Sequence, residues 1–152
     1  MTADDGRPEY DPPERLRRLP SWMASQLARR GESLVNQALE QEGARRQHFA
    51  VLASLAEQGS ASQAALGRRL WIDRSDLHGL LGEMERDGLV ARARDPQDRR
   101  RNVVSLTPAG KTALKRLDKR IDAAQSTLLE PLSAKERRDV IRLLERVVSN
   151  RS

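Results

Sequence analysis

Apolar residues recur three or four positions apart along most of this chain, which is the spacing of amphipathic helices. Residues 14 to 42 follow this pattern, and Pro20 marks a break or a fresh start among them. A second helix is predicted from about residue 46 to residue 58, where Gly59 ends it. We expect this second helix to bury Phe49, Val51, Leu52 and Leu55.

The same periodicity predicts two helices in the last third of the chain. The first runs from Pro108 to about Leu129, with Thr107 as N-cap and proline at the first helical position, where its missing N–H costs nothing. The second follows residues 133 to 136, whose sequence Ser-Ala-Lys-Glu matches a capping box. Its apolar stripe consists of Val140, Leu143, Leu144, Val147 and Val148.

Two shorter helices separated by a break are predicted in the middle of the chain. Ser62 can cap a helix that continues to Leu70, and Asp73 or Ser75 can cap a second helix that runs to about Asp87. Two helices joined by so short a break are typical of a helix-turn-helix. The second helix has one apolar stripe for a core, made of Leu77, Leu80, Leu81 and Met84.

The pattern changes to that of a β-hairpin directly after this helix. Residues 89 to 94 and 103 to 106 are the predicted strands, and Asp95-Pro96-Gln97-Asp98 is the turn between them. Three consecutive arginines, Arg99, Arg100 and Arg101, follow the turn at the hairpin tip. A cationic hairpin behind a helix-turn-helix predicts a winged helix, so the fold class is mainly α with a small β-hairpin wing.

The polar face of the second short helix carries the residues that we expect to touch DNA. Arg74, Ser75, Asp76 and His78 lie near its N-terminus, the end that a recognition helix points at base edges in the major groove. Ser62 and Gln63, at the start of the preceding helix, complete the predicted DNA-binding set together with the hairpin tip. For His78, a solvated side chain is the alternative to a base or phosphate contact.

The residues from the helix-turn-helix through the hairpin resemble the MarR family of bacterial transcription regulators. The resemblance rests on Asp73-Arg74-Ser75, on Asp87-Gly88-Leu89-Val90 and above all on Asp98-Arg99-Arg100 followed by Leu106-Thr107 and Gly110. It implies that Arg100 enters the minor groove, that Asp98 orients it by a salt bridge, and that Arg99 and Arg101 contact backbone phosphates. Asp98 as a turn residue and the arginines as a merely solvated tip are the alternatives.

The predicted domain organisation follows from this layout. Residues 1–12 are expected to form a disordered acidic tail, and residues 13–152 a single domain. Within that domain, residues 45–107 form the winged helix-turn-helix lobe. Residues 14–42 and 108–150 supply N- and C-terminal dimerisation helices, because amphipathic helices outside the lobe need a partner surface. A dimer predicts an inverted-repeat operator with half-sites roughly 10 base pairs apart.

Charge and composition agree with a polyanionic partner. The 152 residues carry a formal net charge of +6 and have a pI near 10.6. Cysteine is absent, which excludes disulfides and thiolate metal sites, and His48 with His78 is poor evidence for a metal, so we expect no metal and no cofactor. No apolar run could span a bilayer and no signal peptide is apparent, which favours a cytoplasmic protein without membrane contact.

The predicted function is a dimeric, sequence-specific DNA-binding regulator and not an enzyme. We predict a repressor that a small aromatic or anionic effector releases from DNA, as the family resemblance implies. Trp22 could stack on such an effector, with Arg29, Arg45 or Arg46 neutralising its charge, although packing is the more ordinary role of Trp22. A protein-recognition winged helix and a non-specific DNA binder are the alternatives to a specific regulator.

Two positions depart from the pattern of the family. Asp76 and Gly79 stand where many relatives have a hydroxyl residue and a larger, often basic residue, so the operator sequence is not predictable. Trp71 occupies a turn position often filled by glycine, where positive φ is common and a bulky residue is strained. We expect a rebuilt turn with Trp71 packed as a lid on the core, and contact with the DNA backbone is the alternative.

Overall fold

The computed structural model describes residues 11–150 and has the mainly helical architecture with a small wing that the sequence predicts. The expected tail over residues 1–12 lies outside the described residues except for its last two positions. In chain order the elements are α1 (Glu14–Arg17), α2 (Pro20–Glu40), α3 (Arg46–Gln58), β1 (Ala61–Ser62), α4 (Gln63–Leu70), α5 (Arg74–Arg86), β2 (Val90–Arg94), β3 (Asn102–Leu106), α6 (Pro108–Leu128) and α7 (Ala134–Ser149).

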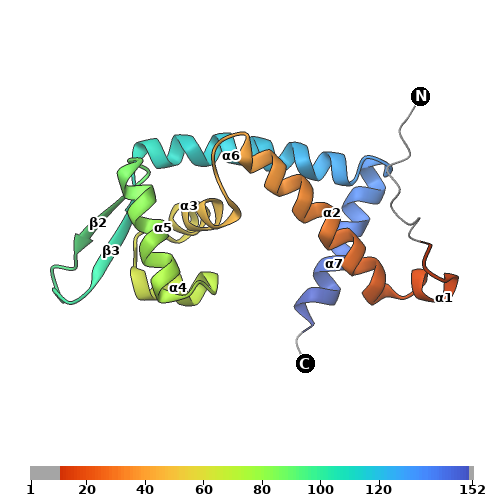
Figure 1. The fold of residues 1–152 in the computed structure, drawn as a ribbon, viewed down its shortest axis with the longest axis horizontal. Helices are drawn as coiled ribbons and strands as arrows, with labels where there is room; N and C mark the ends of the chain where they lie inside the picture. Colours follow the sequence, from red (N-terminus) through yellow and green to blue (C-terminus); the bar gives the residue numbers. More distant parts are fainter. Residues whose placement is uncertain (1–10, 151–152) are drawn as a thin grey trace.

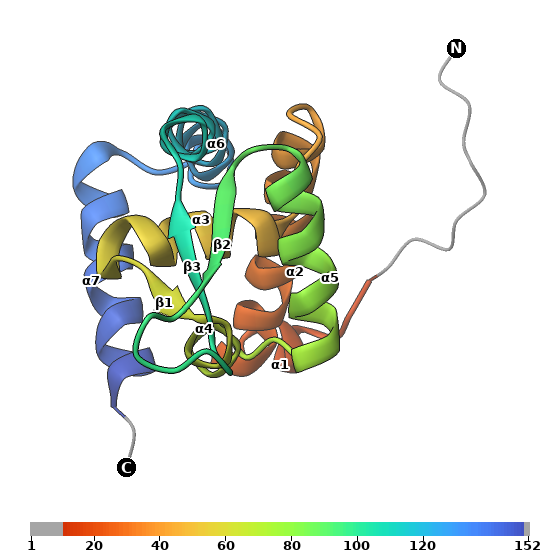
Figure 2. The ribbon, with the colours of Figure 1, turned by 90° about the vertical axis from the view of Figure 1, so that its left-hand side faces the viewer.

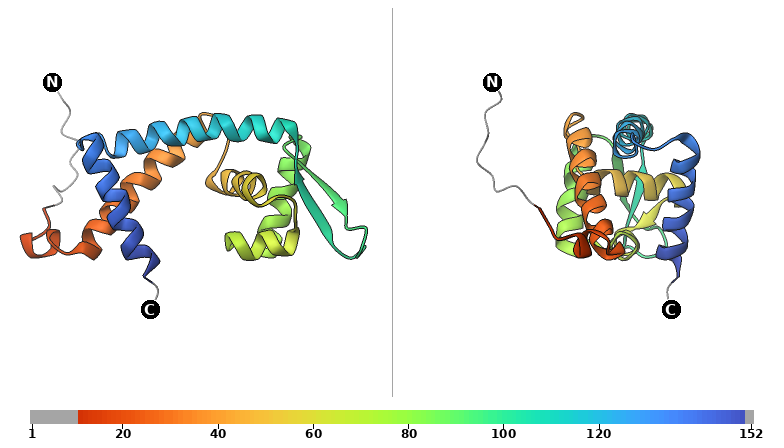
Figure 3. Two further views of the ribbon diagram at one scale, coloured as in Figure 1. Left: turned by 180° about the vertical axis from the view of Figure 1, so that it is seen from behind. Right: turned by 90° about the vertical axis from the view of Figure 1, so that its right-hand side faces the viewer.

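Helix α6 connects the lobe formed by α3, α4, α5 and the sheet with the end of the molecule where α2 and α7 lie. Figure 1 shows it running from the end of the hairpin, above α3, α4 and α5, to the far end where α2 and α7 descend. The view from behind in Figure 3 shows the same arch, and the end views place α2 and α7 on opposite sides of the molecule. Helix α2 packs along α6, so α6 ties the winged lobe to the end helices.

Helix boundaries are set by the capping residues that the sequence predicts. The Ser62 hydroxyl accepts from the Ala65 amide at 3.1 Å, and the Thr107 hydroxyl accepts from the Gly110 amide at 3.0 Å. Ser133 and Glu136 form the expected capping box at the start of α7. Pro20 begins α2 at the first helical position, so it separates α1 from α2 and does not kink one long helix.

The wing is part of a three-stranded antiparallel sheet in the order β1-β3-β2. Strands β2 and β3 pair along five positions, from Val90 with Leu106 to Arg94 with Asn102. Strand β1 pairs with the other edge of β3, Ala61 opposite Val104. The sequence did not predict β1, because two residues are too few to show the alternation of a strand.

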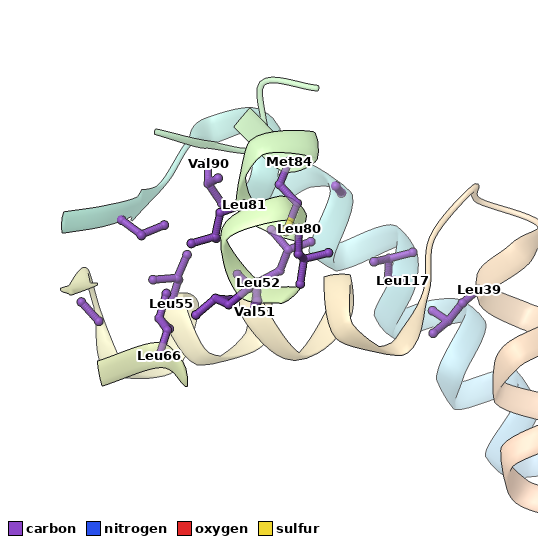
Figure 4. Packing of buried hydrophobic residues seen from close by; sticks show 14 residues of the cluster. Leu39, Val51, Leu52, Leu55, Leu66, Leu80, Leu81, Met84, Val90 and Leu117 are labelled. Carbon is purple, nitrogen blue, oxygen red and sulfur yellow. The ribbon is translucent and has the colours of Figure 1, made fainter. Parts of the chain in front are cut away.

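The hydrophobic core lies where α3, α4, α5 and the sheet meet (Figure 4). The apolar stripe predicted for α5 is buried in full. Phe49, which we expected to be buried, is only partly so and packs at the edge of the core. The largest fully buried side chains are Leu39, Leu52, Leu66, Leu77, Leu81, Met84, Val51 and Val104.

Trp71 does not pack on this core and the turn is not rebuilt, so the expectations of a lid and of a changed turn are both wrong. Its side chain is 92% exposed, and its backbone is left-handed with φ 56° and ψ 40°. The reason is a Schellman ending of α4, in which the Ile72 amide donates to the Gly67 carbonyl at 3.1 Å. This ending buries part of Ile72 and turns Trp71 outward, at a cost of roughly 1–2 kcal/mol for a non-glycine residue.

Gly110 lets α6 approach the segment between α5 and β2 closely. A Cβ at this position would overlap the Leu89 carbonyl oxygen and lie 2.6 Å from Leu106 Cδ1. Gly110→Ala is therefore expected to lower the free energy of unfolding by about 1–3 kcal/mol, because backbone must move to make room. Urea denaturation followed by circular dichroism measures this change.

Gly79→Ala is the matched control for that substitution. Gly79 is helical, and a Cβ there would meet no atom within 4 Å. This variant should be more stable than the parent by up to about 1 kcal/mol, since alanine is the better helix former. An unchanged urea midpoint for Gly110→Ala would show that the contact between Leu89 and Gly110 relaxes without cost.

Helix α7 buries none of its residues in the single chain. Its predicted apolar stripe is turned outward, with Val147 at 75% and Val148 at 72% exposure. Ile141, Leu143 and Leu144 are also exposed on this helix. An amphipathic helix with an uncovered apolar face indicates a surface that another chain covers.

Candidate nucleic-acid interface

The wing tip, residues 95–101, is held in one shape by its own hydrogen bonds. The Asp95 amide donates to the Arg101 carbonyl at 2.8 Å and closes the loop. The Asp95 carboxylate accepts from the Gln97 amide at 2.9 Å, and the Asp98 carboxylate accepts from the Arg100 amide at 3.0 Å. These contacts form the stiff turn that the sequence predicts, and they leave Arg99, Arg100 and Arg101 exposed at the tip.

Asp98 contacts Arg100 in a different way from the one that the family resemblance implies. Its carboxylate forms an ion pair with Arg101, Oδ2 to Nε at 3.6 Å, and the structure shows no ion pair with the Arg100 guanidinium. The hydrogen bond between the two residues runs from the backbone amide of Arg100 to Asp98 Oδ1, at 3.0 Å. In this chain Asp98 therefore positions Arg100 through the backbone, and the expected salt bridge to its side chain is absent.

The N-terminus of α5 presents the predicted polar face to solvent. Arg74, Ser75, Asp76 and His78 are all exposed. Asp73 caps the helix and accepts from both the hydroxyl and the amide of Ser75, at 2.7 and 2.8 Å. These two hydrogen bonds hold the pKa of Asp73 below its usual value. The cap is thus ionised at neutral pH, and it fixes where the helix begins.

An open groove of about 1020 Å³ brings most of the predicted DNA-binding residues together. We call it the interface groove; it lies between α4, the start of α5 and the wing. Ser62, Gln63, Arg74, Ser75, His78, Arg100 and Arg101 line it, together with Ala64, Gly67, Arg68, Ile72, Asp73, Leu77 and Asn102. Asp76, Asp98 and Arg99 do not line it.

The charge of the interface groove is strongly positive. Four arginines and one aspartate line it. Sequence reasoning missed two of its polar members, Arg68 and Asn102. Arg68 lies five positions after Gln63 on α4, and Asn102 begins β3 just after the arginine run, so their proximity to predicted residues was the available signal.

A second set of contacts joins the wing to α5. Glu85 on α5 accepts from the Arg92 amide at 3.0 Å and from the Arg92 guanidinium at 3.3 Å. These bonds hold the pKa of Glu85 below its usual value. Arg92 Nη1 also lies 3.5 Å from His78 Nδ1. The wing and the exposed face of α5 that carries His78 therefore hold a fixed relative position.

The predicted effector residues are not assembled into one site within the chain. Trp22 lies about 15 Å along α2, at the usual helical rise, from Glu32, the residue that pairs with Arg46, and Arg45 pairs with a residue of α5. Arg45 pairs with Glu83 at 2.8 Å and Arg46 pairs with Glu32 at 3.3 Å. Of the predicted set only Arg29, seven residues after Trp22, shares its helix face.

A smaller cavity of about 540 Å³ lies beside α3 and contains Arg45 and His48. His48 Nδ1 accepts from the Arg45 amide at 3.0 Å, and Nε2 faces Glu83 at 3.6 Å. Burial, and then the charge of Arg45, lower the pKa of His48. His48 therefore caps α3 in its neutral form, which is a structural role.

No group of three His, Cys, Asp or Glu side chains that could hold a metal ion is present within residues 11–150.

The described helices contain no stretch that is both long and apolar enough to cross a membrane. This finding agrees with the sequence, which is 33% charged.

Comparisons with known proteins point to one family. The model of the MarR family matches residues 43–101. The homoprotocatechuate degradative operon repressor of Escherichia coli is 32% identical over 103 residues, which cover 68% of this chain and 70% of the repressor. The transcriptional activatory protein BadR of Rhodopseudomonas palustris is 42% identical over 77 residues, 49% of this chain, but the match spans only 44% of BadR.

A solved structure agrees with these matches over most of the chain. The crystal structure of the PcaV transcriptional regulator from Streptomyces coelicolor in complex with its natural ligand superposes with a TM-score of 0.69 at 31% identity. The superposition covers 89% of this chain and 95% of PcaV. The similarity therefore includes the end helices as well as the winged lobe.

Proposed function

Because the chain belongs to the MarR family of transcriptional regulators, we propose that it binds an operator as a dimer and represses transcription by occupying promoter DNA. In this proposal α5 enters the major groove and the wing enters a flanking minor groove. Residues 45–107 act as the DNA-binding lobe, and residues 14–42 and 108–150 as dimerisation segments.

The observation that carries the proposal is the interface groove. It gathers residues from α4, α5 and the wing that lie far apart in the sequence, and its charge suits a polyanion. In this proposal Arg74, Ser75 and His78 contact bases or phosphates, while Ser62 and Gln63 contact the backbone. Arg100 is our candidate for the minor groove, with Arg99 and Arg101 on phosphates. Asp76, exposed on α5, can accept from a cytosine amino group.

The dimer is supported by the uncovered apolar face of α7. A two-fold pairing of this helix with α2 and α7 of a second copy would cover the exposed valines and leucines. It would also present two recognition helices to one face of the duplex. The proposed operator is therefore an inverted repeat, with half-sites roughly 10 base pairs apart.

We propose in addition that a small aromatic or anionic effector releases the protein from DNA. The support is the similarity to PcaV, whose structure contains its natural ligand. Trp22 and Arg29 on one face of α2 are the candidate contacts in this chain. Arg45 and Arg46 are weaker candidates, because each already has a carboxylate partner.

Fluorescence anisotropy with two duplexes tests the proposed function. One duplex is the intergenic DNA upstream of the protein's own gene, the other is the same sequence shuffled, and each is measured at about 50 and 200 mM salt. A preference for the native DNA that persists at the higher salt is expected. Equal and steeply salt-dependent binding would instead show a non-specific binder, and no binding to either duplex would favour protein recognition.

A further inference from the structure

Trp71 is the one large apolar side chain near the interface groove that neither the core nor the turn explains. Among the large hydrophobic residues in positions 11–150 it has the greatest exposure, 92%. Glycine or asparagine would adopt its left-handed backbone at lower cost, and Ile72 makes the apolar contact of the Schellman ending. Trp71 therefore lowers the stability of the fold through its left-handed backbone, and its exposed indole makes no packing contact with the core that would offset this.

The position of Trp71 in the lobe indicates what could cover it. It lies at the end of α4, two residues before Asp73, the N-cap of α5. In Figures 1 and 2, α4, the start of α5 and the wing tip lie together on the side of the lobe opposite α6. Trp71 lies between Arg68 and Ile72 in the sequence, and both of these residues line the interface groove.

The charges around Trp71 select an anionic partner. Arg68 and Arg69 precede it in the last turn of α4, and Arg74 begins α5. Arg68 and Arg74 both line the interface groove. Three arginines and one carboxylate, that of Asp73, lie within three positions of the exposed indole, and their net positive charge would repel a basic surface and attract phosphates.

We propose that Trp71 lies against the sugar-phosphate backbone of duplex DNA, beside the major groove that α5 enters. The indole N–H can donate to a phosphate oxygen, and the ring can pack on a deoxyribose. The proposal rests on the proposed function, since it needs α5 on DNA. It assigns Trp71 to affinity and positioning rather than to base recognition, because backbone contacts carry no sequence information.

Two substitutions separate the role of the ring from that of the turn. Trp71→Asn keeps a residue that tolerates the left-handed backbone and removes the indole. It should bind both the native and the shuffled duplex about fivefold to tenfold more weakly, by a similar factor for each. Its thermal unfolding midpoint should stay the same or rise by a few degrees, about 2–5 °C. Trp71→Phe keeps an aromatic ring without the N–H donor and should bind with intermediate affinity.

Fluorine NMR of protein labelled with 5-fluorotryptophan gives an independent readout. The chain has two tryptophans, so two resonances are expected, and the one missing from Trp71→Phe belongs to Trp71. In the free dimer this resonance should show solvent exposure, and it should shift on addition of the duplex. The Trp22 resonance, on α2 and away from the interface groove, separately reports any change at the other end of the chain.

The outcomes distinguish this proposal from the proposed function. If the parent binds DNA but Trp71→Asn binds equally well and the resonance does not shift, the Trp71 contact is wrong and the DNA-binding function stands. If the Trp71 resonance is already shielded without DNA, a second copy of the chain covers the ring and the contact is again wrong. If the parent binds no DNA, the proposed function itself fails and the Trp71 contact fails with it.

Discussion

Replacing Leu144 and Val148 together by glutamate is expected to convert the protein from a dimer to a monomer and to abolish tight operator binding. Both side chains belong to the exposed apolar face of α7. A dimer would bury both positions. The free energy needed to bury two unpaired carboxylates there exceeds the favourable free energy of dimerisation. A monomer contacts one half-site only, so we expect operator affinity to fall by about 100-fold or more.

Light scattering coupled to size-exclusion chromatography measures the mass, and anisotropy measures the affinity. The matched control is Leu144→Met with Val148→Ile, which keeps the face apolar and should remain a dimer. Circular dichroism should show unchanged helix content in both variants, because neither position is buried in the single chain. A glutamate variant with the mass of two chains would place the dimer interface elsewhere.

Arg100→Ala should weaken operator binding by about 1–3 kcal/mol, or roughly 5- to 150-fold. The reason is that the stiff tip presents Arg100 at the edge of the interface groove, where its guanidinium can enter a minor groove without further ordering. The loss should be larger on the operator than on the shuffled duplex, since minor-groove width depends on sequence. Anisotropy titrations on both duplexes measure this difference.

Arg99→Ala is the control for Arg100→Ala, because Arg99 is equally charged and exposed but lies outside the interface groove. Because Arg99 is proposed to contact a phosphate, its replacement by alanine should weaken binding to both duplexes by a similar factor and reduce the salt slope by about one.

Asp98→Ala should give a smaller loss of operator affinity than Arg100→Ala, since it removes the acceptor of the Arg100 amide but keeps the Arg100 guanidinium. Operator affinity unchanged by Arg100→Ala would contradict the assignment of the wing to a minor groove.

The sequence was a good guide wherever a local signal decides the structure. Capping residues at 62, 107 and 133 set three helix starts, and the apolar stripe of α5 is buried as its spacing predicts. Local hydrogen-bond chemistry and helical periodicity act over a few residues, so they can be recognised without a fold. Seven of the ten predicted contact residues also meet in the interface groove, since a helix-turn-helix and its wing have a narrow range of geometries.

The failures share a different origin. Trp71 was expected on the core, but the Schellman ending of α4 turns it outward. Arg45 and Arg46, predicted to neutralise an effector beside Trp22, pair with Glu83 on α5 and with Glu32 midway along α2, and their role toward an effector stays a prediction. Asp98 was expected to pair with Arg100 and pairs with Arg101 instead. In each case two or more candidate partners were available, and only their distances in space chose between them.

By itself, then, the sequence determined the helical elements, their caps, the cationic wing tip and the family of the chain. These features depend on residues that are neighbours along the chain, so their physics is contained in short segments. Only the tertiary structure decided that α4, α5 and the wing enclose one positive groove, that the apolar face of α7 is uncovered, and that Trp71 is exposed beside the recognition helix. The burial of a side chain and its distance to other side chains depend on how the chain packs, because both involve segments that are distant from one another in the sequence.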